Sequence, residues 1–290
     1  MEPLYEEKTF ENFFNAELGR KSALYFPFGQ VQEGRMGADA AAYSPHWLLW
    51  DELGFLRRFP SRKSGIDLPA LARYMERYLQ EEIRNIPKIK VNLIFQYKRP
   101  EFLKNSKATE WKLWKRPYFR YDIYKKQQQL LMRLHSRFGR KVLVLYASPA
   151  INDVDDLVRA VSADAIIQNT NFRPVSQLDK HHRNTYIKSG LDSKACSDPE
   201  HLEPFDLLVA LQEFRADPDT DNVQAISSFM SSASSIAQED EHLGDAFRML
   251  MESYREQGLT EYKLVYGLLS MQTLRDLSGL QWMLAVDEAR

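Results

Sequence analysis

The segment from Lys90 to Lys98, KVNLIFQYK, constrains the fold of this chain more than any other. Side chains of a strand alternate between its two faces, so Gln96 and Lys98 project to the same side. The other side is wholly apolar and carries Val91, Leu93, Phe95 and Tyr97. The alternation predicts a strand that rests on a core and presents Gln96 and Lys98 together.

Residues 141–147, KVLVLYA, are apolar on both faces, which is typical of a central strand covered by helices. Apolar periodicity predicts the other elements of this half of the chain. Helices are expected over 10–21, 67–86, 123–138 and 153–161, and shorter strands over 39–43 and 165–168. This alternation predicts an α/β fold, with a mixed central sheet flanked by helices.

The character of the sequence changes beyond about residue 174. Polar loops come first, and helical segments follow near 205–215, 222–237, 241–257 and 260–285. We therefore expect an α/β domain over residues 1–174 and a mostly helical region over 175–290 that regulates or assembles it. The last helices carry an apolar stripe of Leu264, Leu268, Met271, Leu274, Leu277 and Leu284. Such a stripe is usually core, and it could also dock a protein partner or form a homo-oligomer.

The formal net charge of −1 conceals two oppositely charged segments. Between residues 98 and 126, ten Lys or Arg face three acids, a balance of +7. Between residues 198 and 261, fifteen Asp or Glu face three Arg, a balance of −12. The separation of the signs along the chain, rather than their sum, indicates a polyanion-binding segment.

Several classes of protein are disfavoured by what the sequence lacks. Its single cysteine, Cys196, excludes an internal disulfide framework and a thiolate zinc cluster. The start of the chain does not look like a secretory signal, and no window approaches about 18 continuous apolar residues. We therefore expect a cytoplasmic protein with no membrane span. No GxxxxGK[ST], GxGxxG or GxSxG pattern occurs, and the pair His181-His182 is best interpreted as part of a loop.

Three elements follow one another in a particular order: Glu17 in the first helix, Asp39 in GADA, and Gln96-Tyr97-Lys98 on the strong strand. This order resembles the PD-(D/E)XK nuclease superfamily, with FQYKR similar to the QxK variant of Mrr-type restriction nucleases. The resemblance covers about residues 10–170. It implies a restriction-endonuclease-like helix–strand–strand–strand–helix–strand core and a role in bacterial antiviral defence. This chain departs from the simplest pattern by a helical insertion between Asp39 and the QxK strand.

The chemistry of such a site follows from its residue types. Asp39 and the amide oxygen of Gln96 would hold Mg²⁺ or Mn²⁺. Lys98 would orient or deprotonate the attacking water, or offset charge in the transition state of DNA phosphodiester hydrolysis. Glu17, at the edge of its helix's buried stripe, would complete the acidic set. These four residues, Asp39, Gln96, Lys98 and Glu17, are the expected catalytic group.

Each of these residues has a structural alternative. Asp39 follows a glycine, where an aspartate is often a turn residue. Gln96 and Lys98 could be the solvated face of a half-buried strand, and Glu17 could be an exposed helical residue. The rival function is a non-catalytic adaptor that keeps a nuclease-like scaffold and binds nucleic acid or a protein partner. The single neutral ligand at position 96 favours it, because one carboxylate fewer weakens metal affinity.

A basic and aromatic linker is expected after the QxK strand, up to about residue 121. Lys and Arg neutralise phosphates, while aromatic side chains can stack on exposed bases. The expected nucleic-acid-binding residues are Arg99, Lys104, Lys107, Lys112, Trp114, Lys115, Arg116 and Arg120. Trp111, Tyr118, Phe119 and Tyr121 could add stacking surface. The alternative is a loop whose aromatics pack into the core and whose charges are only solvated.

Overall fold

The computed structural model describes residues 5–22, 24–25, 68–187, 192–196 and 199–287. Contacts between Cα atoms divide the chain into two compact units. Unit 1 consists of Met1–Tyr25, Ile89–Asp217 and Gly279–Arg290, and unit 2 of Phe26–Lys88 and Pro218–Ser278. This differs from the division expected at residue 174, because unit 1 continues to Asp217 and includes the end of the chain, while unit 2 includes Phe26–Lys88.

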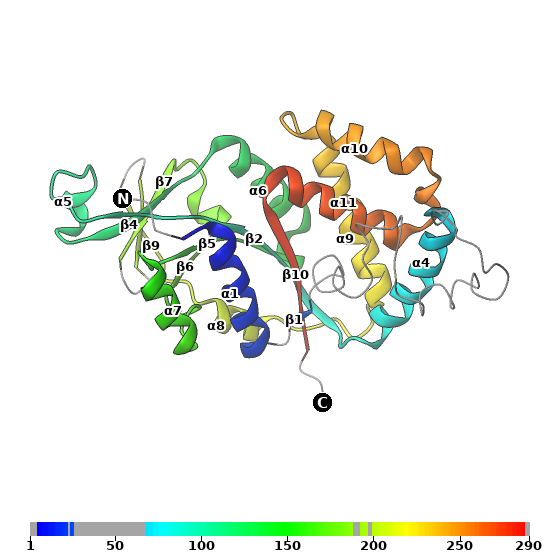
Figure 1. Ribbon diagram of the computed structural model, residues 1–290, viewed down its shortest axis with the longest axis horizontal. Helices are drawn as coiled ribbons and strands as arrows, with labels where there is room; N and C mark the ends of the chain where they lie inside the picture. Colours follow the sequence, from blue (N-terminus) through cyan, green and yellow to red (C-terminus); the bar gives the residue numbers. More distant parts are fainter. Residues whose placement is uncertain (1–4, 23, 26–67, 188–191, 197–198, 288–290) are drawn as a thin grey trace, which may run out of the picture. The chain divides into compact units, whose positions relative to one another are not determined.

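Unit 1 is built on a five-stranded mixed sheet in the order β1-β10-β2-β5-β6 (Figure 1). The strands are β1 Leu24–Tyr25, β10 Leu280–Val286, β2 Ile89–Tyr97, β5 Val142–Pro149 and β6 Thr170–Pro174. β2 and β5 are parallel, and the other neighbours are antiparallel. The predicted α/β fold with a mixed sheet flanked by helices and a helical C-terminal region is confirmed.

Helices cover both faces of β2, including the face that carries Gln96 and Lys98. Phe14 of α1 (Glu7–Lys21) packs its ring 5.5 Å from Phe95 and 5.6 Å from Tyr97. α6 (Lys125–Phe138) covers the opposite face, where its Gln128 accepts a hydrogen bond from Tyr146 of β5. Unit 1 also contains α7 (Val154–Ser162) and α8 (Leu207–Glu213). The two faces of the strand are therefore both buried.

A second sheet in unit 1 has the order β3-β4-β7-β8-β9 and is antiparallel throughout. Its strands are β3 Glu101–Leu103, β4 Tyr118–Asp122, β7 Arg183–Tyr186, β8 Ser193–Ala195 and β9 Glu200–Leu202. The prediction of an irregular linker after the QxK strand is wrong. This segment forms a hairpin of β3 and β4 that carries α5 (Trp111–Trp114). Short strands of three to five residues give too little periodicity to be predicted.

Unit 2 is helical in its described part, with α4 Leu68–Asn85, α9 Asn222–Gln238, α10 Gly244–Glu256 and α11 Lys263–Ser278. Leu264, Met271 and Leu274 of α11 are buried, so this part of the apolar stripe is core. Gly267 allows close packing, since a Cβ there would lie 2.6 Å from the Met230 side chain of α9. Glu76 of α4 accepts hydrogen bonds from the first amides of α11.

Two of the predicted elements differ from the structure. The helix expected to run to residue 285 ends at Ser278, because Gly279 adopts φ +75° and the chain then enters β10. The run LQWMLAV is too uniformly apolar for its period to separate helix from strand. The strand expected at 165–168 is a turn, and β6 follows it. Within the described ranges, no helix combines the length and apolarity needed to span a bilayer.

Candidate functional site

Gln96 and Lys98 lie at the C-terminal end of β2, on the face covered by α6. Tyr146 of β5 is the register partner of Gln96, and the Lys98 ammonium lies 5.6 Å from the centre of its ring. The amide of Lys98 donates to Ala147 O at 2.9 Å, which extends the pairing with β5 beyond the strand. The expected projection of Gln96 and Lys98 to one side is consistent with these contacts.

The Lys98 side chain is buried, with 7% of its surface exposed. Its Nζ donates a 2.6 Å hydrogen bond to Oε1 of Gln127 in α6 and lies 4.6 Å from the centre of the Tyr124 ring. Burial lowers the pKa of Lys98 to about 8, against the opposing effects of Glu7 and Asp122. An amine with this pKa can exchange a proton near neutral pH.

Gln96 carries a buried oxygen with no hydrogen-bond partner in the described part of the chain. The residue is 4% exposed, and its Nε2 donates to Tyr97 O at 3.2 Å. Oε1 is left without a donor. An unsatisfied buried acceptor costs free energy, of the order of 1–3 kcal/mol, and is uncommon in folded proteins. Such an oxygen is suited to a cation or an ordered donor.

Glu17 lies on the other side of the sheet from Lys98. It belongs to α1, whose Phe14 packs on the apolar face of β2, and it is 1% exposed. Its carboxylate accepts hydrogen bonds from the amides of Ile166 and Ile167 at 2.6 and 3.1 Å, and Lys21 pairs with it at 2.8 Å. The structure therefore does not bring Glu17 to Gln96 and Lys98, and its contacts are those of a buried structural carboxylate.

The carboxylate that the structure does place beside the end of β2 is Glu7, at the start of α1. Its Oε2 accepts a hydrogen bond from the amide of Arg99 at 3.2 Å. Burial raises the pKa of Glu7, and the nearby charge of Lys98 opposes that rise. Glu7 is thus an acidic neighbour of Lys98 that no motif in the sequence marks.

Asp39, the expected anionic metal ligand, lies outside the described residues. Among the residues that are described, no group of three or more His, Cys, Asp or Glu has the arrangement of a metal site. The oxygen of Gln96 fits one ligand position for a hard cation, and a carboxylate such as that of Asp39 would have to supply another.

The expected nucleic-acid-binding residues belong mainly to the connection between β3 and β4. We call residues 104–117, which include α5, the α5 segment. This segment packs on the outer face of the second sheet: Trp114 donates to Thr185 at 3.1 Å, and Lys194 lies 4.7 Å from the Trp114 ring. Lys194 also donates to Leu113 O. The α5 segment is therefore a packed element rather than an extended loop.

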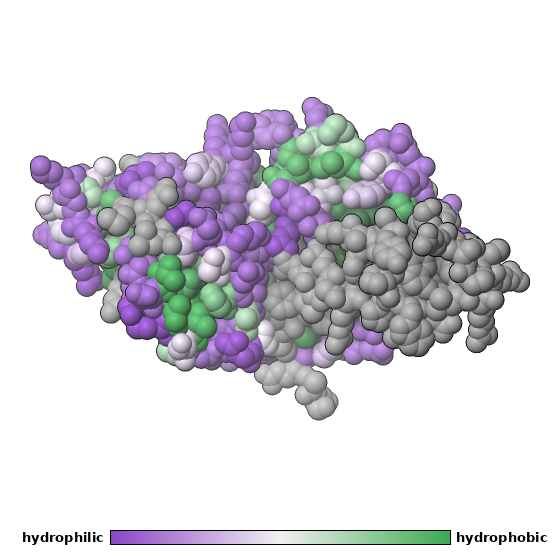
Figure 2. Space-filling model, in the orientation of Figure 1, coloured by the Kyte–Doolittle hydropathy of each residue, from purple (hydrophilic) through white to green (hydrophobic). Residues whose placement is uncertain are grey.

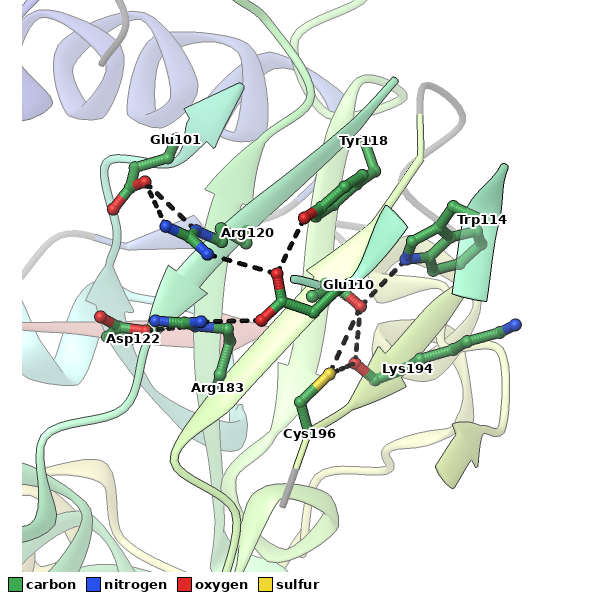
Figure 3. Close-up of polar contacts among 10 residues, drawn as sticks. Glu101, Glu110, Trp114, Tyr118, Arg120, Asp122, Arg183, Lys194 and Cys196 are labelled. Atoms are coloured by element: carbon green, nitrogen blue, oxygen red, sulfur yellow. Dashed lines mark hydrogen bonds and ion pairs between the residues drawn. The ribbon is translucent and has the colours of Figure 1, made fainter. Parts of the chain in front are cut away.

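Glu110 anchors the α5 segment to the sheet (Figure 3). This buried carboxylate accepts hydrogen bonds from Arg183 at 2.7 Å, Tyr118 at 2.8 Å and Arg120 at 3.2 Å. Burial would raise the pKa of Glu110, but these donors together hold it below its usual range. The two arginines extend the network outward to Glu101 and Asp122.

Arg99 and Arg120 have structural partners. Arg99 lies 3.7 Å from Glu6, and Arg120 bridges Glu101 and Glu110. Trp114 is half-buried against Thr185 and Lys194. The other five expected binding residues are exposed: Lys104, Lys107, Lys112, Lys115 and Arg116.

The expected stacking surface is largely wrong. Tyr118, Phe119 and Tyr121 are at most 4% exposed, and the Phe119 ring stacks on Phe102 at 4.5 Å and on Tyr186 at 5.5 Å. Because side chains of a strand alternate, Phe119 and Tyr121 both project into the space between the sheets. Burial of their apolar area there stabilises the fold and leaves them inaccessible to the bases of a ligand. The aromatics of this region mainly hold the hairpin together.

Gln127 and Glu110 were not among the predicted site residues, and the sequence could have identified only one of them. Gln127 is a polar residue within the otherwise apolar stripe of its helix, and that exception marks it. Glu110 is one acid among many cations, and nothing in the sequence distinguishes it.

Comparisons with models of protein families, with curated proteins and with solved structures find no match to this chain.

Proposed function

We propose that this protein is a metal-dependent nuclease that hydrolyses phosphodiester bonds of DNA at the end of β2. The observation that carries the proposal is the buried oxygen of Gln96, which lacks a partner among the described residues and belongs to the same strand face as Lys98. The resemblance of Gln96-Tyr97-Lys98 to the QxK motif of PD-(D/E)XK nucleases supports it. The parallel pairing of β2 and β5 with α6 between them in sequence is compatible with that core.

Gln96 and Asp39 would hold Mg²⁺ or Mn²⁺, Gln96 as a neutral oxygen ligand and Asp39 as the anionic one. Such an ion supplies charge neutralisation at the phosphate and at the leaving oxygen. The amide of Gln96 is already oriented for this role, because its nitrogen donates to Tyr97 O and leaves its oxygen available.

Lys98 would contribute the proton chemistry. With a pKa of about 8, part of the Lys98 population is neutral at physiological pH and can accept a proton from water, while the rest carries a positive charge. Gln127 positions the nitrogen through a 2.6 Å hydrogen bond to its Oε1. Either state would help hydrolysis, the neutral amine as a base and the ammonium as a counter-charge.

The proposal is tested by cleavage of plasmid and linear DNA with Mg²⁺ or Mn²⁺. Asp39→Ala, Gln96→Leu and Lys98→Met should each lower the rate at least about 100-fold while the proteins stay folded. Lys141→Met, at an exposed lysine of unit 1, is the matched control and should keep full activity. Cleavage that survives the three site variants would place the active site elsewhere.

A second candidate is the non-catalytic adaptor, which the enclosure of Lys98 favours. Its ammonium is bonded to Gln127 and covered by the Tyr124 ring, so a substrate would have to displace both. A wild-type protein that binds DNA but does not cut it with either metal would support this candidate. Service in bacterial antiviral defence and a cytoplasmic location remain predictions from the sequence, as does partner binding or self-association through the C-terminal helices.

A further inference from the structure

The α5 segment presents a concentrated positive charge to solvent. Its five exposed cations, Lys104, Lys107, Lys112, Lys115 and Arg116, lie within thirteen consecutive positions. Among the described residues none of the five forms an ion pair, and Lys104 lies 5.1 Å from the centre of the Phe102 ring. The surface at the α5 end of unit 1 is mainly hydrophilic (Figure 2).

The three acids of the hairpin are already paired with arginines. Glu110 is bound by Arg120 and Arg183, Glu101 by Arg120, and Asp122 by Arg183. The three carboxylates of the hairpin are thus paired with two arginines, Arg120 and Arg183, whose side chains are 19% and 18% exposed. The two arginines offset two of the three negative charges, which reduces the competition of these acids for the lysines and Arg116.

The same network fixes the shape of the surface. Glu110 immediately precedes α5, and Trp114, at the end of α5, is held by Thr185 and Lys194. Side chains that project from a rigid element lose less conformational freedom on binding than side chains of a mobile loop. Several exposed cations on one short, anchored segment can contact several phosphates of a polyanion.

We infer that the α5 segment binds the phosphate backbone of nucleic acid through its exposed cations, without stacking on bases. The inference rests on the proposed function only for the identity of the polyanion, DNA. Tyr118, Phe119 and Tyr121 are buried. Trp114 is half-buried and packs against Thr185 and Lys194, so most aromatic side chains of the hairpin already have partners within the protein. Binding is therefore independent of sequence, depends strongly on salt, and does not need an unpaired strand.

The inference is tested by fluorescence anisotropy of the full chain with a labelled DNA duplex of about 20 base pairs, in EDTA and at several salt concentrations. The test variant is Lys107→Glu/Lys112→Glu/Arg116→Glu, which leaves Lys115 unchanged because that residue has φ +51°. The matched control is Arg137→Glu/Arg140→Glu/Lys141→Glu, with the same change of charge at exposed positions near the end of α6. Circular dichroism checks that both variants are folded.

We expect the test variant to bind the duplex at least about 10-fold more weakly, and its slope of log affinity against log salt to be shallower by about 2–3. The control should stay within about 3-fold of wild type, and a single strand of equal length should bind no more tightly than the duplex. Equal losses in both variants would overturn the inference. Tighter binding to the single strand, or preferential binding to vesicles of anionic lipid, would overturn it too. Since EDTA prevents metal-dependent cleavage, failure of binding and failure of catalysis are observed separately.

Discussion

The Nζ atom of Lys98 donates a 2.6 Å hydrogen bond to Oε1 of Gln127, so the hydrogen-bond partner of this ammonium is a neutral amide. The charged groups that act on Lys98 are Glu7 of α1 and Asp122 of β4, and both favour its protonated form. Desolvation on burial lowers the pKa of Lys98 by more than these two carboxylates raise it. The proton affinity of Lys98 therefore depends on the partner at position 127 being uncharged.

Gln127→Glu should raise the pKa of Lys98 by about one unit or more, because a carboxylate would replace the amide within hydrogen-bond distance. The pKa is measured from the pH dependence of acetylation of Lys98, followed by mass spectrometry. Gln129→Glu adds the same charge at an exposed position two residues away and should change the pKa by a few tenths of a unit. Equal shifts in the two variants would contradict the assigned contact.

Lys98 should make the protein more stable as the pH rises above about 8. Its folded-state pKa of about 8 lies below the ordinary value of 10.5, so between these limits the unfolded chain binds the extra proton. The gain in unfolding free energy between pH 8 and 9.5 should be about 1.5 kcal/mol relative to Lys98→Met. Urea unfolding of both proteins at each pH measures it. Parallel pH profiles would show that Lys98 titrates normally.

Glu17→Ala should destabilise unit 1 by about 2–4 kcal/mol, because it leaves two buried amides without an acceptor. Glu17→Gln keeps one oxygen and should cost about half as much. Asn12→Ala, exposed on the same helix, is the control and should change stability by less than about 0.5 kcal/mol. Urea unfolding gives the stabilities. If the Glu17→Ala protein were as stable as wild type but failed to bind metal, Glu17 would be a residue of the metal site rather than a structural carboxylate.

Glu110→Gln should weaken the fold by about 2–3 kcal/mol at neutral pH, since Arg120 and Arg183 lose a shared carboxylate. The pKa of Glu110 is depressed in the folded state, so its contribution is present above the unfolded value and lost as the pH falls through the folded one. Between pH 5 and 3 the variant should therefore lose less stability than wild type. Thermal unfolding across this range measures the difference.

Glu101→Gln is the comparison for Glu110→Gln. The Glu101 side chain is 41% exposed and pairs with Arg120, so its loss should cost under about 1 kcal/mol. If both variants were equally destabilised, the anchoring role of Glu110 would have to be abandoned.

The strong secondary-structure elements of this chain follow from its sequence. The alternation in KVNLIFQYK predicts β2 and the shared face of Gln96 and Lys98, because a side chain's face depends only on its position in the strand. The periodicity of 123–138 predicts α6, and the uniform apolarity of 141–147 predicts a central strand. These are local properties, and the structure adds to them only the bounds.

The rest depended on contacts between residues far apart in sequence. The carboxylate of Glu17 has the same local context whether it faces a metal or the amides of Ile166 and Ile167, some 150 positions away, and only the packing of α1 selects the amides. The aromatics of the basic segment likewise became core because β4 pairs with β7. Sequence determined which residues can do chemistry. Tertiary structure decided which of them are occupied elsewhere, because a buried polar group must be satisfied by whichever partner the fold brings to it.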